Sequence, residues 1–162
     1  MEPEKGISFE DWAGENAGYF PDRSGAEIVT ILEIWRDQAA AAAGIDDLEL
    51  AAPLQRHLTA RGTGLPSNFA LLLTPGEAIA VKFDARNSHH PVEVAASQFG
   101  KRVGEWPRAE LTVSDVERGK LASGLTLSVG DGRAIPCRTP RLAGNPAAAI
   151  LITTLGAELP TV

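Results

Sequence analysis

The adjacent histidines His89 and His90 are the first residues of this 162-residue sequence to consider for chemistry, because imidazole both ligates metals and transfers protons near neutral pH. Adjacent residues of an extended segment point to opposite faces, so the two rings cannot easily share one metal ion. Asp84 or Glu93 could add oxygen ligands, but no His-x3-His or Cys-x2-Cys spacing accompanies the pair. We therefore interpret the histidines as part of a solvated loop and predict no metal site.

A hydrolytic triad would need a nucleophile, a histidine and a carboxylate, and Ser88 with His89 or His57 supplies the first two on paper. The sequence has no Gly-x-Ser-x-Gly motif, and the strand–turn–helix context of that motif is missing as well. Cys137 is the single cysteine, and no motif surrounds it, although a neighbouring Arg138 can lower a thiol pKa. We therefore predict no catalytic residue and interpret Cys137 as a half-buried structural thiol.

The glycine-rich stretches do not match known nucleotide-binding motifs. Residues 100–104 and 130–132 lack a Gly-Lys-Ser/Thr sequence, and neither stretch leads directly into a helix, so they form neither a P-loop nor a dinucleotide fingerprint. We predict no cofactor, and the balance of these patterns is against an enzyme.

Charge is distributed unevenly along the chain, whose net charge is −6. Residues 1–66 hold 12 acidic and 5 basic residues, whereas residues 67–162 hold 9 acidic and 10 basic residues. An acidic chain repels a phosphate backbone, which argues against nucleic-acid binding. The second half has six basic residues in predicted loops or strand ends, where they could form a basic patch for a lipid, for an acidic peptide or for the chain's own residues 1–23: Arg86, Lys101, Arg102, Arg108, Arg118 and Lys120.

Composition also bears on the class of protein and its location. The 25 alanines, and 11 arginines against 4 lysines, are typical of a high-GC bacterial genome. A single cysteine permits no internal disulfide, and no apolar run reaches the 18 residues that a membrane span needs. The first residues lack the basic and apolar regions of a signal peptide. We expect a cytoplasmic protein without a transmembrane segment.

The first 62 residues are predicted to contain an acidic segment and a helical hairpin. Residues 1–23 are acidic but carry aromatic residues, so they are expected to pack against the chain's own core or, alternatively, against a partner. Ser24 and Glu27 form a capping box before a helical apolar pattern that ends at Gly44. Leucines four residues apart predict a second helix before residue 62, kinked or restarted at Pro53. The apolar residues around Trp35 exceed one buried face, which is also typical of an oligomer interface.

The period of the apolar residues changes after residue 66. Residues 69–73 and 78–83 are predicted to form a hairpin, followed by weaker strand candidates at 92–96 and 99–106 and a clearer one at 109–116. The alternating segment 125–129, the Asp-Gly turn at 131–132 and the segment 133–138 predict a second hairpin. Asn145 and Pro146 then begin a helix that reaches residue 155.

This order of elements resembles the pleckstrin-homology-like (PH-like) fold, and in particular the small bacterial PH-like and GRAM-like domains. The resemblance spans residues 67–158 and is carried by residues 69–74, 78–83, 125–132 and 145–155. It implies a recognition or assembly module. In eukaryotic members, basic residues of the first hairpin loop often bind phosphoinositides, but the corresponding turn here, residues 74–77, contains no lysine or arginine, so this mode of binding is not expected.

Together these patterns predict an α+β protein. It would comprise the acidic segment 1–23, a helical hairpin at 24–62, and a six- or seven-stranded antiparallel PH-like barrel or roll at 67–158 with a closing C-terminal helix. We expect a non-enzymatic binding or assembly module that acts through protein–protein contacts or self-association. Two alternatives stay open: a ligand or enzyme site in the barrel mouth near His89, His90 and Trp106, and peripheral membrane contact through the basic patch. The residues of the candidate interaction surface are Trp12, Trp35, Arg86, His89, His90, Lys101, Arg102 and Arg108.

Overall fold

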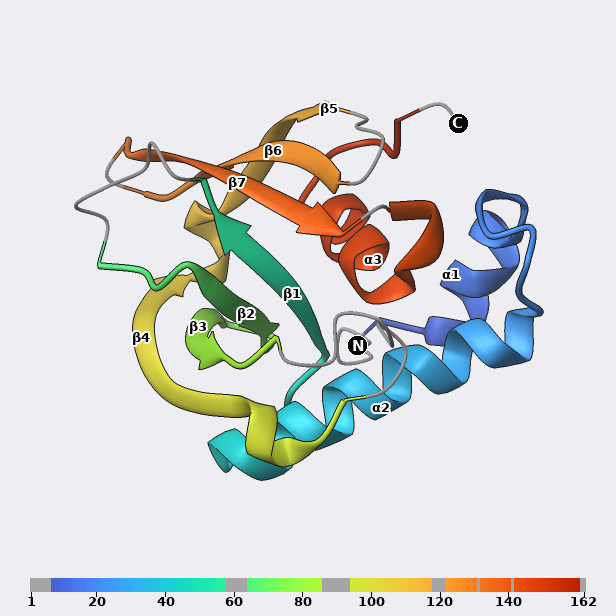
Figure 1. Ribbon diagram of the computed structural model, residues 1–162, viewed down its shortest axis with the longest axis horizontal. Helices are drawn as coiled ribbons and strands as arrows, with labels where there is room; N and C mark the ends of the chain where they lie inside the picture. Colours follow the sequence, from blue (N-terminus) through green and yellow to red (C-terminus); the bar gives the residue numbers. More distant parts are fainter. Residues whose placement is uncertain are drawn as a thin grey trace, which may run out of the picture.

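The computed structural model describes residues 7–57, 64–85, 94–117, 122–130, 132–140 and 142–160. This part of the chain forms three α-helices and seven strands (Figure 1). In chain order they are α1 (Phe9–Asn16), α2 (Gly25–Ala43), β1 (Leu50–Arg56), β2 (Asn68–Leu73), β3 (Glu77–Phe83), β4 (Phe99–Pro107), β5 (Thr112–Glu117), β6 (Ala122–Ser128), β7 (Ala134–Pro140) and α3 (Pro146–Thr154). The expected α+β class, with helices near the start of the sequence and one after the last strand, is confirmed.

The seven strands form one antiparallel sheet in the order β4-β3-β2-β1-β7-β6-β5. Strands β4 and β5 are its two edges, and no pairing between them closes the sheet within the described residues. Strand β1 pairs with β2 along six residues, but with β7 only at Gln55 and Arg56. The sheet is therefore an open one, with four-stranded and three-stranded parts joined at the end of β1.

Helix α2 forms where its capping signals predict it. The Ser24 hydroxyl accepts a hydrogen bond from the Glu27 backbone, and the Glu27 carboxylate accepts one from the Ser24 backbone. Gly44 ends the helix in the left-handed region at φ 68°, a conformation that costs glycine little. One face of the helix is buried, and it carries Ile28, Ile31, Leu32, Trp35 and Ala39. The first helix of the predicted hairpin is confirmed.

The predicted second helix of the 24–62 hairpin is wrong, because residues 50–56 form strand β1. A short apolar run is compatible with either a helix or a doubly buried strand, so the leucine spacing was ambiguous. Pro53 is tolerated because of where its nitrogen points. Arg56 donates its backbone N–H to Ser67 on the β2 side, and His57 donates to Pro136 on the β7 side. Because successive backbone nitrogens of a strand point to alternate sides, the nitrogen of Pro53 faces β7. Only Gln55 and Arg56 of β1 pair with β7, so Pro53 lies outside that pairing and no hydrogen bond between the strands is lost.

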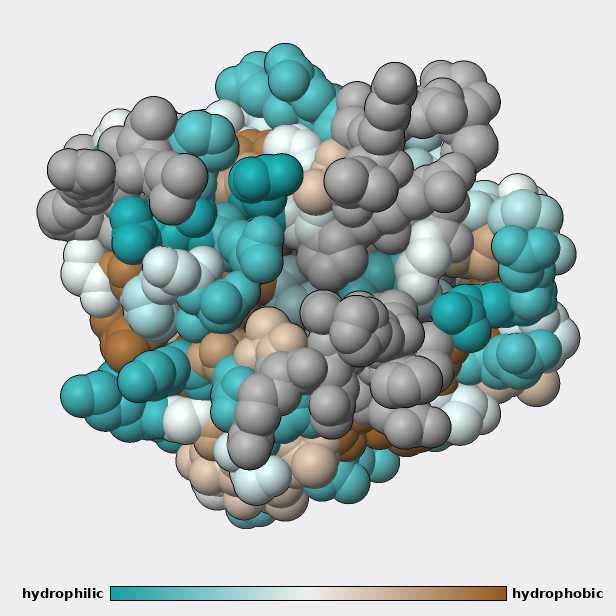
Figure 2. All heavy atoms as spheres, in the orientation of Figure 1, coloured by the Kyte–Doolittle hydropathy of each residue, from teal (hydrophilic) through white to brown (hydrophobic). Residues whose placement is uncertain are grey.

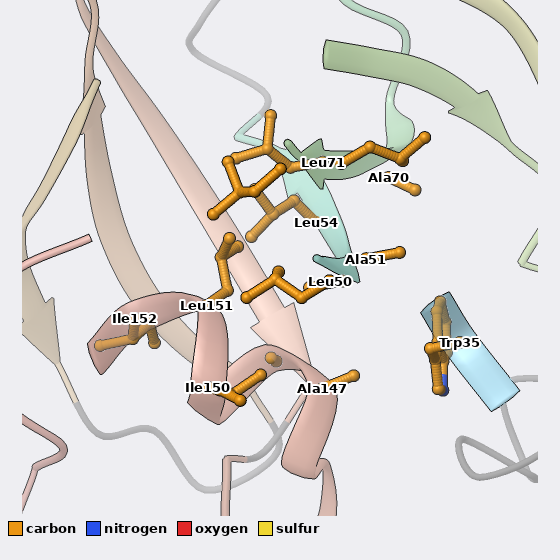
Figure 3. Packing of buried hydrophobic residues seen from close by; sticks show 14 of the residues in the cluster. Trp35, Leu50, Ala51, Leu54, Ala70, Leu71, Ala147, Ile150, Leu151 and Ile152 are labelled. Atoms are coloured by element: carbon orange, nitrogen blue, oxygen red, sulfur yellow. The ribbon is translucent and has the colours of Figure 1, made fainter. Parts of the chain in front are cut away.

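Strand β1 is buried on both faces (Figure 3). Leu50, Leu54 and Leu71 point toward α3, whereas Ala51 and Ala70 lie on the side of α2 and Trp35. Small side chains on that side leave room for the Trp35 ring, which packs 5.4 Å from Phe83 and 6.0 Å from Phe99, measured between ring centroids. Strands β1 and β2 thus lie between two helices. Because both of their faces are buried, these strands show no alternation of polar and apolar residues.

The last helix is buried all round, and the first helix lies against it. Residues 147–152 of α3 are all buried, and its start is capped by Asn145, whose side chain accepts a hydrogen bond from the Ala148 backbone, as predicted. The indole N–H of Trp12 in α1 donates to the Thr153 hydroxyl at 2.8 Å. Phe9 and Phe20 are also buried, and α1 contacts α2. The described residues of the acidic segment therefore pack against the chain's own core.

A charge placed at Ala52 should distinguish the strand from the predicted helix. Ala52 is fully buried in β1, whereas a helix with Leu50 and Leu54 on its inner face would direct Ala52 outward. We expect Ala52→Glu to lower the free energy of unfolding by at least about 3 kcal/mol, because it buries an unpaired carboxylate in a filled core. Urea denaturation would measure this, with the exposed neighbour Gln55→Glu as the control, which should cost under about 1 kcal/mol. Equal effects would contradict the strand.

Candidate interaction surface

The basic residues predicted to form a patch are only partly available. Lys101 and Arg102 are exposed on β4, but Arg102 donates to the Glu105 carboxylate at 2.9 Å within the same strand. An exposed pair of this kind contributes little to stability, yet it balances the charge locally. Arg86, His89 and His90 lie outside the described residues, so their part in the predicted surface stays a prediction.

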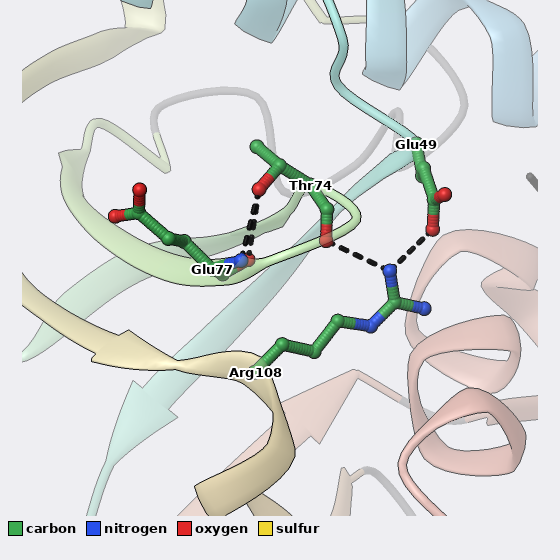
Figure 4. Close-up of polar contacts among 4 residues, drawn as sticks. All are labelled: Glu49, Thr74, Glu77 and Arg108. Carbon is green, nitrogen blue, oxygen red and sulfur yellow. Dashed lines mark hydrogen bonds and ion pairs between the residues drawn. The ribbon is translucent and has the colours of Figure 1, made fainter.

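Arg108 is engaged by its own chain (Figure 4). Its side chain is 23% exposed, and one guanidinium nitrogen donates to the Glu49 carboxylate and, at 2.8 Å, to the Thr74 carbonyl. The backbone N–H of Arg108 donates to the Gly76 carbonyl at 3.0 Å. One residue thereby joins the segment before β1, the β2–β3 turn and the end of β4. The geometry is that of an internal clamp, and it cannot be found from local sequence patterns because the partners are 59 and 34 residues away.

The first hairpin turn, residues 74–77, is ordered by its own polar groups. The Thr74 backbone donates to the Glu77 carbonyl at 2.9 Å, and the Glu77 backbone donates to the Thr74 hydroxyl at 3.0 Å (Figure 4). Arg108 contacts this turn through the Thr74 carbonyl, but its charge is already paired with Glu49. Within the described residues, this turn presents a carboxylate and carbonyl groups rather than the converging donors that a phosphate needs.

The two tryptophans of the predicted surface are covered by the chain itself. Trp12 is buried against Thr153 and Phe20, and Trp35 is buried against Phe83 and Phe99. Their indoles therefore act in the core rather than at a surface. Trp106 of β4 is half-buried, and its ring lies so close to Gly104 that a Cβ there would come within 2.8 Å of it. The alternative site near His89, His90 and Trp106 depends on residues outside the described ranges.

Cys137 lies in β7 with its side chain toward the core. Burial raises the pKa of its thiol from an ordinary 9.0 to about 12, because a thiolate would lose its hydration there. Such a thiol is a poor nucleophile. Among the described residues, no group of three His, Cys, Asp or Glu side chains is placed to hold a metal ion.

Both edges of the sheet are poorly suited to pairing with another strand. Edge strand β4 has two register shifts against β3 and ends in Pro107, which has no N–H to donate. At the other edge, the Val113 N–H of β5 donates to the Leu155 carbonyl at 3.3 Å, and Asp115 breaks the register with φ 52°. Bulges, proline and chain coverage are the usual protections against edge-to-edge association.

The outward face of β5, β6 and β7 differs from the rest of the sheet, because among the described elements no helix covers it and its side chains are small. Inward residues such as Leu125, Leu127 and Ile135 are buried, while their neighbours along each strand are exposed or half-exposed. In register, the outward residues form three rows across the strands: Thr112–Ser128–Ala134, Ser114–Thr126–Pro136 and Glu117–Gly124–Arg138. We call these nine residues the outer face.

The outer face is the surface that sequence reasoning missed. The alternation in residues 125–129 did predict that Thr126 and Ser128 point away from the core. Which residues of β5 and β7 stand beside them depends on the register across strands, and the Asp115 bulge shifts that register by one residue. In the view of Figure 2, hydrophilic and hydrophobic residues of the described part of the chain are interspersed over the surface.

Removing the Arg108 clamp should destabilise the chain measurably. Arg108→Ala leaves the Glu49 carboxylate, which is 14% exposed, without its ion-pair partner, so we expect a loss of about 2 kcal/mol in the free energy of unfolding. The matched control is Arg102→Ala, whose exposed pair with Glu105 should be worth under about 1 kcal/mol. A smaller loss for Arg108 than for Arg102 in chemical denaturation would show that the clamp is not structural.

The Cys137 thiol should make stability fall at high pH. The folded chain keeps the thiol proton up to about pH 12, whereas the unfolded chain releases it above pH 9.0, so the stabilisation is complete below pH 9.0 and is lost between these values. Above pH 9.0 the loss should approach about 1.4 kcal/mol per pH unit. Urea unfolding at about pH 8 and about pH 10.5 should show this steeper loss in the natural chain than in Cys137→Ala. Parallel losses in both chains would contradict the shift.

Comparison with known proteins does not indicate a function, so a function has to be argued from the geometry. No model of a known protein family matches the sequence, and no curated protein matches it significantly. In the described part of the chain, no helix combines the length and the apolar character that crossing a membrane requires.

Proposed function

We propose that this chain is a non-enzymatic binding or assembly module that acts through protein–protein contacts made by the outer face of β5, β6 and β7. The observation that carries the proposal is that no helix among the described elements covers this face of the sheet, while the faces of β1 are buried under α2 and α3. Seven of its nine residues are uncharged, and five of these seven are serine, threonine or alanine.

The side chains of the outer face suit contact with another protein surface. Serine, threonine, alanine, proline and glycine have few rotatable bonds, so covering them costs little side-chain entropy. The hydroxyls of Ser114, Thr126 and Ser128 can rotate, so each can donate a hydrogen bond to a partner's group or accept one from it.

The finer architecture that we propose is a PH-like roll. Its support is the strand order, the narrow two-residue junction between β1 and β7, and a single helix that follows the last strand and packs against β1. Modules of this kind use a rigid roll to present binding surfaces. The clamp at Arg108 and the protected edges would serve the same purpose here, because they keep the sheet in one register while its outer face is used.

The charges of the described residues favour a protein partner over a lipid headgroup. Arg102 and Arg108 are paired with Glu105 and Glu49, so two of the described cations of the predicted basic patch are already compensated. Attraction to an anionic membrane needs several uncompensated cations close together. The outer face, in contrast, carries one acid and one base, Glu117 and Arg138.

A charged substitution at the centre of the outer face should abolish partner binding. We expect affinity capture with the Thr126→Arg chain to lose, by at least about tenfold, proteins that the natural chain retains, because a buried guanidinium would lack a partner in the contact. The matched control is Thr30→Arg, which adds the same group at an exposed position of α2. Quantitative mass spectrometry of the three captures is the measurement.

Two results would overturn this proposal. Either the captured proteins are the same for Thr126→Arg and the natural chain, or Thr30→Arg loses them equally. Circular dichroism of each variant is needed beside the capture, so that a loss of folding is not mistaken for a loss of binding.

A further inference from the structure

The two charged residues of the outer face stand on opposite sides of a glycine. Register pairing places Glu117 of β5 beside Gly124 of β6, and Gly124 beside Arg138 of β7. Both charged residues are exposed, and among the described residues neither belongs to an ion pair. Neighbouring strands lie about 4.8 Å apart, so a carboxylate and a guanidinium flank a side-chain gap about 10 Å wide.

This arrangement is complementary to itself. A two-fold axis that runs along β6, within the plane of contact, exchanges the two sides of the face and keeps positions along the strand unchanged. It places Glu117 of one copy opposite Arg138 of the other, and does so twice. An in-plane axis perpendicular to the strands would leave each charge on its own side and would bring neither pair together.

The remaining residues fit the same symmetry. The axis puts Thr112 opposite Ala134, and Ser114 opposite Pro136. The β6 residues, Gly124, Thr126 and Ser128, meet their own counterparts. All of these side chains are small, so two sheets can approach without a steric conflict on the face, and the hydroxyls along β6 can hydrogen-bond to one another.

We propose that the outer face binds a second copy of this chain, as a weak symmetric dimer held in register by two Glu117–Arg138 pairs. This inference rests on the proposed function, of which it names the partner. Three strands of six residues cover an area of about 300–400 Å² per copy. A stable dimer usually buries about 800 Å² per partner, so this smaller contact belongs to the weak, transient class of interface, and its equilibrium should be sought between about 10 µM and about 1 mM.

Charge exchange between the two positions is the test. We expect sedimentation velocity of the natural chain, from about 10 µM to about 1 mM, to show a reversible monomer–dimer equilibrium. Glu117→Arg and Arg138→Glu should each weaken it by at least about tenfold, because each variant places two like charges opposite each other in both pairs. Lys101→Glu, an equal charge reversal at an exposed site of β4, should leave the dissociation constant within about threefold of the natural value.

The decisive arm mixes the two single variants. In a heterodimer of Glu117→Arg with Arg138→Glu, every facing pair is again one acid and one base, so association should return to within about threefold of the natural strength. The double variant carrying both changes should also dimerise. If the natural chain, the double variant and the mixture dimerise but neither single variant does, position 117 of one copy must face position 138 of the other, and no effect on folding can imitate this pattern.

The outcomes separate this inference from the proposed function. A natural chain that stays monomeric at about 1 mM, or a dimer that the charge reversals leave unchanged, overturns the second copy as partner. If such a monomer still loses captured proteins through Thr126→Arg, the outer face binds a different protein and the proposed function stands. If neither the equilibrium nor the capture responds to outer-face substitutions, both are wrong.

Discussion

Strand β1 must be covered on both faces, and the rest of the fold is arranged around that requirement. Its residues 50–54 are buried, with Leu50 and Leu54 toward α3 and Ala51 toward α2. Burial of this many apolar side chains is the main favourable contribution to folding, and it is lost if either helix moves away. Helix α3, whose residues 146–152 are all buried, in turn needs cover on its remaining side, and α1 contributes to that cover through Trp12 and its bond to Thr153. The described residues of the acidic segment therefore pack as part of the core.

Sequence patterns were sufficient where the relevant interactions are local. The capping box at Ser24, the glycine stop at Gly44 and the Asn145–Pro146 start each involve residues within a few positions, and the structure has all three. Strand β1 was missed because it is buried on both faces and so has no alternation, while its leucine spacing imitates a helix. Only long-range pairing with β2 and β7 decides its conformation, and pairing partners cannot be found in a single sequence.

The candidate site was predicted less well than the fold, for a related reason. A list of cations and aromatic residues does not say which are already engaged, and Trp12, Trp35 and Arg108 all proved to have partners within the chain. The outer face, conversely, contains no residue type that attracts attention in a sequence. Its significance depends on three strands bringing small residues together and placing Glu117 and Arg138 on either side of Gly124.

The protection of the sheet edges and the character of the outer face together restrict how this chain can associate. A strand added at an edge would compete with the bulges and Pro107 on β4, and with the Leu155 carbonyl on β5. Edge pairing also propagates, because each added strand presents a new edge, whereas contact between two faces related by a two-fold axis closes after two copies. If the outer face binds a second copy as we propose, the blocked edges and the two-fold symmetry together stop association at two copies, without extended aggregates.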